Sequence, residues 1–353
     1  MNAEVFPRLI RAIHEQHLDG LLAVSPENVA YVVGFPVGGP GEPRWRQAAA
    51  LVTWDGRTAL LCVDAHAEAI RRRMRAETVV RSWGEFGDNP THILADLLAE
   101  FHLSQSRVGT ELDSLAAADF RVLTARFPNV TWAPAEGLLT RLRRVKGPRE
   151  VERLRHLSRI VDQAFMDVLT SLKREVGERE ARALFAQQVL RLGAEECRVA
   201  VRRAEAGERS AILGIEVIAC IEGYHAVMAR TAAPGLPGEL RRKWKEREAA
   251  HRRLIEALTP GGSGDELSSR TERLQATLGL PGESLVAHGI GLASVEEPFL
   301  GPFPEPRVEA DMVLAVGPEG TAPWPLRDMV LVTPNGPELL THRSHPAWGI
   351  AWA

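Results

Sequence analysis

The sequence has few cysteines and no long apolar run, and these absences exclude several classes of protein. Its 353 residues include three cysteines, Cys62, Cys197 and Cys220, which lie far apart and match no CxxC or Cys/His metal spacing. Buried thiols are therefore expected rather than a disulfide framework or a thiolate metal site. No stretch approaches the ~18 apolar residues of a membrane helix, and the first residues lack the features of a secretion signal. We expect a cytoplasmic protein with no membrane association.

The chain also lacks a strong excess of either charge. Its formal net charge is -3, with 25% charged and 45% hydrophobic residues, as in soluble globular proteins. The basic runs at residues 71–73 and 241–245 have acidic neighbours, as solvated helix faces do, so nucleic-acid binding is not expected. The length suits two domains, each with a substantial core.

The first part of the sequence alternates between helical and strand patterns. Apolar residues recur at helical spacing over 7–17, and an apolar run follows at 18–24. Ser25 is suited to cap the next helical turn, and Asp55–Gly56 predicts a tight turn between two strands. The alternation indicates an α/β layer domain over residues 1–136. The predicted elements are strands at 48–53, 58–63, 78–82 and 107–110, and helices at 64–75, 90–102 and 113–126.

A change in composition at 134–137 predicts the boundary with a second domain, residues 137–353. Long helical periodicity follows over 138–172, after which helices and mostly antiparallel strands are mixed, as in an α+β domain. The further predicted elements are helices at 178–192, 239–258 and 264–278, and strands at 212–220, 225–229, 312–316 and 328–333.

Motifs of one known family occur at 18–35 in the first domain, at 142–155 at the junction, and at 222–231, 288–298, 312–318 and 327–333 in the second domain. Together they resemble the "pita-bread" metallopeptidase family, which includes Xaa-Pro dipeptidase (prolidase), aminopeptidase P, methionine aminopeptidase and the metal-free relative creatinase. The resemblance implies a creatinase-type N-terminal domain, a pita-bread C-terminal domain and a homodimer.

The resemblance also implies a site for two divalent cations, held by two Asp, one His and two Glu side chains. The five corresponding positions are Glu216, Val227, His288, Gly317 and Arg327, and the position of the family's catalytic His is Val295. Of the five, only Glu216 and His288 have side chains that coordinate metals. Arg327 places a fixed positive charge where a cation would lie. We therefore expect a degenerate family member with no metal and no other cofactor.

Nearby carboxylates do not restore the missing ligands. Asp328 follows Arg327 by one residue, and a one-residue step along a strand points a side chain to the opposite face. Glu319 follows Pro318, where the strand is expected to end, and no carboxylate follows Val227 until Glu239. Residues 199–210 also lack the His that the family carries in its substrate-binding loop, so prolidase-like substrate handling is not expected.

Several functions remain open. In a pseudo-enzyme, Arg327, His288 and Glu216 would form a hydrogen-bonded or ionic group in the cleft, which would bind a small molecule, a peptide or a protein. In a metal-independent hydrolase, His288 would act as general acid or base, oriented by Glu216, with Arg327 stabilising an oxyanion; alternatively, His288 serves folding alone. A structural role would use the dimer, with Trp45 and the tail 348–353 either as interface anchors or packed on their own domains. A divergent Xaa-Pro dipeptidase is the remaining alternative.

Overall fold

The computed structural model describes residues 4–38, 48–172, 176–205, 211–232, 238–262, 269, 287–300, 307–317 and 325–341. The chain divides into two compact units, Met1–Arg143 and Arg144–Ala353, which are described separately. Trp45, Glu319, the C-terminal tail and, apart from residue 269, the predicted helix at 264–278 lie outside the described residues. No helix within the described residues is both long and apolar enough to cross a bilayer.

The first unit is built on a six-stranded sheet with the order β4-β3-β2-β1-β5-β6. β2 runs antiparallel to β1 and β3, whereas β1–β5, β3–β4 and β5–β6 are parallel pairs. This arrangement confirms the predicted α/β class. The strands are β1 Gly20–Ala23, β2 Ala49–Thr53, β3 Thr58–Val63, β4 Val79–Trp83, β5 Arg107–Thr110 and β6 Thr131–Pro134. The helices are α1 Phe6–Glu15, α2 Pro26–Val33, α3 Asp64–Arg73, α4 Pro90–Glu100, α5 Ala117–Arg126 and α6 Glu136–Arg144.

Local sequence signals account for several of these boundaries. The Ser25 hydroxyl accepts a hydrogen bond from the Asn28 backbone N–H at 3.3 Å, which confirms the predicted cap of α2. Gly34 ends the same helix in the left-handed region, at φ 93°. Gly56 takes φ 86° in the turn between β2 and β3, as the Asp-Gly signal predicts.

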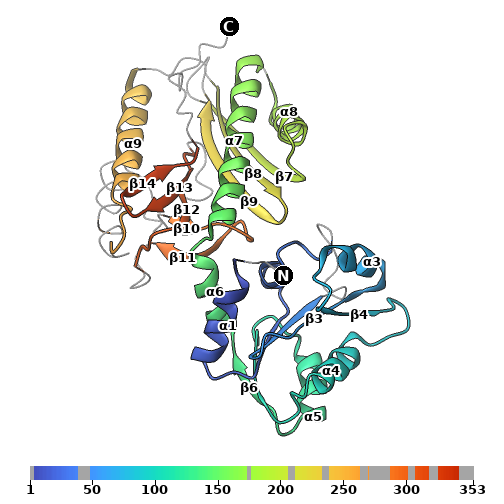
Figure 1. Cartoon of the computed structure of the whole chain (residues 1–353). Coiled ribbons are helices and arrows are strands. Elements are labelled where there is room, and N and C mark those ends of the chain that lie inside the picture. Colours follow the sequence, from blue (N-terminus) through green and yellow to red (C-terminus); the bar gives the residue numbers. More distant parts are fainter. Residues whose placement is uncertain are drawn as a thin grey trace. The chain divides into compact units, whose positions relative to one another are not determined.

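The second unit combines a three-stranded sheet, β7-β8-β9, with a five-stranded sheet of order β11-β10-β12-β13-β14. Helix α7 lies along β8 and β9, and α8 lies beside β7 (Figure 1). The unit therefore has the predicted α+β class. Its helices are α7 Pro148–Ser171, α8 Glu178–Arg191 and α9 Gly238–Glu256. Its strands are β7 Glu196–Glu205, β8 Ala211–Ile221, β9 Tyr224–Ala232, β10 Ala287–Gly289, β11 Glu296–Leu300, β12 Val313–Val316, β13 Asp328–Thr333 and β14 Gly336–Leu339.

Two details differ from the sequence-based expectations. The continuous helical pattern over 138–172 is two helices, because Gly147 is the extended N-cap of α7 and Pro148, which has no N–H, starts that helix. The charged stretch beginning at Val199, compared above with a substrate-binding loop, continues strand β7 as far as Glu205. In that strand Val199 and Val201 are buried between exposed residues, which is the period of a half-buried strand.

Candidate functional site

The candidate site lies where the two sheets of the second unit meet. An isolated antiparallel bridge pairs Ala229 of β9 with Arg327, the residue that precedes β13. Across β9, the register pairs Ala229 with Glu216 of β8. Directly paired residues point to the same face of a sheet, so Glu216 and Arg327 project from the same side.

Glu216 and Arg327 form an ion pair, with 3.2 Å between Arg327 Nη1 and Glu216 Oε2. The Arg327 side chain is 3% exposed and that of Glu216 is 27% exposed, so the cation is buried while the carboxylate reaches solvent. The Arg327 backbone is held in place as well. Its N–H donates to Ala229 O at 3.0 Å, and its carbonyl accepts from Arg230 Nη1 at 2.6 Å.

Behind this pair, Asp328 is the centre of a buried polar network. Its carboxylate is hydrogen-bonded to His251 Nε2 at 2.9 Å and to the Thr341 hydroxyl at 2.6 Å, and it forms an ion pair with Arg230. Burial raises the pKa of Asp328, but the Arg230 charge and the bonds from His251 and Thr341 outweigh burial and hold this pKa below its usual range. Asp328 is therefore engaged with Arg230 and His251, whereas Arg327 faces Glu216.

Val227 and Gly317 offer no oxygen or nitrogen side-chain ligand. Val227 is buried, and its backbone N–H lies 3.3 Å from the sulfur of Met329. Gly317 has φ 123°, and a Cβ added there would lie 2.1 Å from the carbonyl oxygen of Leu326. Atoms cannot approach so closely, so this backbone leaves no room for a side chain at position 317.

His288, unlike Glu216, belongs to the five-stranded sheet. It lies on β10, is 1% exposed, and its Nδ1 is 2.8 Å from the carbonyl oxygen of Gly289. The structure joins Glu216 to Arg327 instead, and no hydrogen bond joins His288 to Glu216 among the described contacts. Val295 lies just before β11, with 42% of its surface exposed. Within the described residues, no three His, Cys, Asp or Glu side chains gather as a metal site requires.

Sequence reasoning missed a second buried ion pair in this unit. Lys146 Nζ lies 2.6 Å from Glu296 Oε1, with side-chain exposures of 1% and 8%. Gly291 makes room for this pair, since an added Cβ would lie 2.6 Å from the same oxygen. Both charged residues fall within segments that carry the family resemblance, but nothing in the sequence indicates that they meet.

Two further titratable groups on these strands, Cys220 and His225, are not activated nucleophiles. Burial raises the pKa of Cys220 to about 11, which keeps the thiol protonated at neutral pH. His225 lies opposite Cys220 in the β8–β9 register, and burial lowers its pKa despite a contact of 3.2 Å with Gly291 O. Cys62 and Cys220 are buried as predicted, and Cys197 is half-buried.

Comparison with known proteins identifies the family of the chain. The model of metallopeptidase family M24 matches residues 152–334, slightly more than half of the 353 residues. The chain belongs to this family. The model of the creatinase/prolidase N-terminal domain matches residues 6–145, ahead of the M24 region. Both matches confirm the resemblance drawn from the motifs.

Relatives of this M24 chain match it over nearly their whole length. The Xaa-Pro dipeptidase of Pyrococcus furiosus is 25% identical, covering 96% of this chain and 97% of the relative. The uncharacterized peptidase YqhT of Bacillus subtilis is 24% identical, covering 92% and 94%. Among solved structures, the Xaa-Pro dipeptidase from Bacillus anthracis superposes with a TM-score of 0.81 at 21% identity, covering 96% and 97%. The predicted fold, a creatinase-type domain followed by a pita-bread domain, is thereby confirmed.

Proposed function

We propose that this M24 chain keeps the peptidase fold but has lost the two-metal centre, and that the site binds a small molecule, a peptide or a protein instead of hydrolysing peptides. The observation that carries the proposal is the ion pair between Arg327 and Glu216. The positive guanidinium of Arg327 neutralises the negative charge of Glu216, which a bound metal cation would otherwise neutralise. The three residues at the other ligand positions are Val227, His288 and Gly317.

Electrostatics supports this proposal. At an effective dielectric constant of ~20, a dication about 4 Å from a guanidinium is repelled by roughly 8 kcal/mol, close to six powers of ten in affinity. One carboxylate and one imidazole are too few to offset this repulsion, since affinity for a dication depends on the number and charge of its ligands. The backbone at Gly317 also leaves no room for a further carboxylate.

The same geometry favours binding over metal-independent hydrolysis. A general base must come within hydrogen-bonding distance of the proton it removes, but His288 is 1% exposed. Its proposed orienting partner, Glu216, is bound to Arg327.

An assay of Ala-Pro and Met-Ala dipeptides tests the proposal. The protein is assayed with excess Mn²⁺ or Zn²⁺ and again with a chelator, beside the Pyrococcus furiosus Xaa-Pro dipeptidase as a positive control. We expect no turnover above the rate without protein in either condition. Turnover that requires stoichiometric bound metal would overturn the proposal in favour of a divergent dipeptidase. Turnover that persists in chelator but disappears in a folded His288→Ala variant would identify a metal-independent hydrolase.

A further inference from the structure

Strand β7 carries two arginines on the face of its sheet that also carries Glu216, which we call the Glu216 face. Ala200 of β7 is paired with Glu216 of β8, so both point to this face. Arg198 and Arg202 lie two residues before and after Ala200, and side chains two residues apart on a strand share a face. Both arginines are exposed. The ion pair of the candidate site therefore lies beside two exposed guanidinium groups.

Helices cover the opposite face of the same sheet. Val199 and Val201 of β7 are buried on that side. Cys197, which has the same alternation as the valines, places its sulfur 3.7 Å from the carbonyl oxygen of Ala186 on α8. The alternation of β7 thus directs its valines towards the helices and its two exposed arginines to the other side, where they are accessible to a ligand.

Neither arginine meets a carboxylate across the sheet. The residues paired with them on β8 are Ile218 and Gly214, and within the residues that the structure describes neither arginine forms an ion pair. An arginine on the edge strand of the first unit differs in this respect, since Arg81 of β4 is paired with Glu100 at 2.7 Å. Opposite charges on neighbouring strands stabilise a sheet, so the two arginines of β7 gain no such stabilisation.

Positive charge exceeds negative charge on the Glu216 face. The charged side chains of β7–β9 and Arg327 on this face are Arg198, Arg202, Arg327, Glu196 and Glu216. Glu216 is already paired with Arg327, and no ion pair joins Glu196 to Arg198 among the described contacts. Burial lowers the pKa of His225, which is therefore neutral at pH 7. A surface with such an excess of charge concentrates anions.

Small residues surround Glu216 on this face. Its partners are Ala200 on β7 and Ala229 on β9, and Arg202 is opposite Gly214, which has no side chain. The Cα atoms of the two arginines are about 13 Å apart, since a strand rises ~3.3 Å per residue. Each guanidinium ends a long, flexible side chain. Together they can hold two anionic groups of one small molecule across Ala200.

We infer that the Glu216 face binds a small ligand with two carboxylate groups, one held by Arg198 and the other by Arg202. A guanidinium binds a carboxylate through two parallel hydrogen bonds, and this geometry makes arginine well suited to such a ligand. The inference gives a chemical class to the ligand of the proposed binding function. It rests on that function, in which Arg327 rather than a metal neutralises Glu216.

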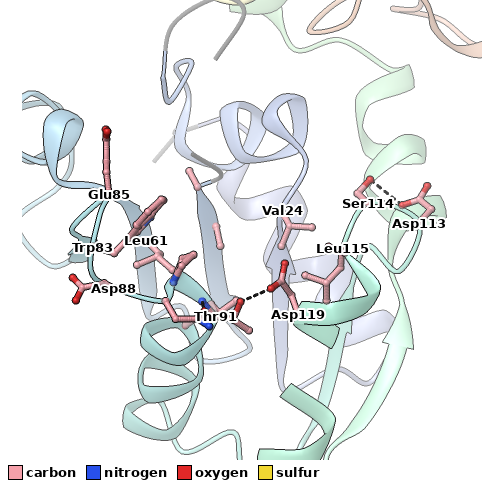
Figure 2. Close-up of a pocket in the computed structure, with 16 residues that line it drawn as sticks. Val24, Leu61, Trp83, Glu85, Asp88, Thr91, Asp113, Ser114, Leu115 and Asp119 are labelled. Carbon is pink, nitrogen blue, oxygen red and sulfur yellow. Dashed lines mark hydrogen bonds between the residues drawn. The ribbon is translucent and has the colours of Figure 1, made fainter. Parts of the chain in front are cut away.

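The cavity of the first unit does not compete for such a ligand. Its volume is about 820 Å³, and its charged lining residues within the described part of the chain are all acidic. Figure 2 shows Glu85 and Asp88 at one end and Asp113 at the other, with Asp119 between them. Carboxylates repel an anion, so a dicarboxylate is expected on the Glu216 face instead.

Three probes of equal length test the inference: adipate with two carboxylates, its monoamide with one, and adipamide with none. Binding to the full chain, treated with chelator and then freed of it, is measured by calorimetry and by ligand-observed NMR. We expect saturable binding of adipate to one site, at least tenfold weaker binding of the monoamide, and weaker binding of adipate in high salt. Equal binding of adipate and the monoamide, or no binding of adipate at about 10 mM, would overturn the inference.

The variants Arg198→Gln and Arg202→Gln each remove one guanidinium. Their matched control is Arg182→Gln, an exposed arginine of α8 on the other side of the sheet. With all three variants folded by circular dichroism, adipate is expected to bind each single variant no more tightly than the monoamide binds the wild type. Its affinity for the control should be unchanged. Unchanged adipate affinity in either β7 variant would contradict the inference.

The dipeptide assay separates failure of this inference from failure of the proposed function. Turnover that requires bound metal would overturn the proposed function and this inference with it. No turnover together with no binding of adipate would overturn this inference alone.

Discussion

At the scale of single residues, the main feature of the second unit is the unequal burial of an ion pair. The Arg327 side chain is 3% exposed, while Glu216 keeps contact with solvent. A buried charge that loses its counter-charge is costly, whereas a partly hydrated carboxylate recovers much of its solvation from water. The two residues should therefore respond differently to substitution.

Glu216→Gln is expected to lower the free energy of unfolding by about 3 kcal/mol, because it removes the carboxylate facing a buried guanidinium. Arg327→Met is expected to cost only about 1 kcal/mol, since Glu216 is partly hydrated and the new side chain is apolar. Urea unfolding of each variant measures both values. The double variant should be more stable than Glu216→Gln alone. Equal effects of the two single substitutions would contradict this account of the pair.

Asp328 makes the stability of the second unit depend on pH. Its folded pKa lies below the unfolded value of about 4, so its contribution is fully present above pH ~4 and is lost as pH falls through the folded pKa. At pH 7, Asp328→Asn should destabilise the protein by about 3–5 kcal/mol. Urea unfolding between pH 3 and 7 should show a smaller loss of stability on acidification in this variant than in the wild type. The control Asp96→Asn, an exposed carboxylate paired with Arg126, should follow the wild-type curve.

The sequence predicts the ligand positions, but it does not predict which residues they contact in the fold. The motifs around Gly223 and Pro298 align the chain with the family, and this alignment predicts which residues stand at the ligand positions. Arg230 lies next to Asp328 because a bridge joins Ala229 to Arg327. His251 lies on helix α9, 77 residues before Asp328 in the sequence. No local periodicity encodes such contacts.

At the scale of elements, the close approach of β12 to the start of β13 decides what position 317 can hold. Gly317 follows β12 directly, and its Cα hydrogen points at the Leu326 carbonyl, where an added Cβ would overlap with the oxygen. A glutamate side chain at position 317 would therefore require the two strands to separate.

Gly317→Ala tests this crowding, with Gly336→Ala as the matched control. The two glycines have nearly equal φ values of 123° and 119°, but an added Cβ at Gly336 meets nothing within 4 Å. The control should lose about 1–2 kcal/mol of stability from backbone strain alone. Gly317→Ala should lose at least about 2 kcal/mol more, because overlap is added to strain. Equal losses in urea unfolding would show that the strands separate easily.

Regular elements were predicted best where the sequence pattern is simple. β5 and β13 have the predicted bounds, and the turn at Asp55–Gly56 is in place. β7 was missed because its charged residues alternate with buried valines, and composition hides this alternation. β6, β10, β11 and β14 were missed since strands of three to five residues give a short pattern that is hard to recognise.

At the scale of the whole molecule, the chain has the fold of its family, and we propose that most of the residues at the family's metal site are changed. Matches to both family models and to a full-length prolidase structure fix the architecture. Fold and function are separable, because chemistry depends on a few side chains placed on a common scaffold. The homodimer and the cytoplasmic location stay predictions of the sequence.

Metal binding tests the central claim most directly. Mn²⁺ is titrated by calorimetry into chelator-treated, full-length protein, with the Pyrococcus furiosus Xaa-Pro dipeptidase measured in parallel. The account predicts no saturable binding to this chain at concentrations up to about 1 mM. Two saturable sites with dissociation constants near or below about 1 μM would show that a dinuclear centre forms despite Arg327, and would contradict the account.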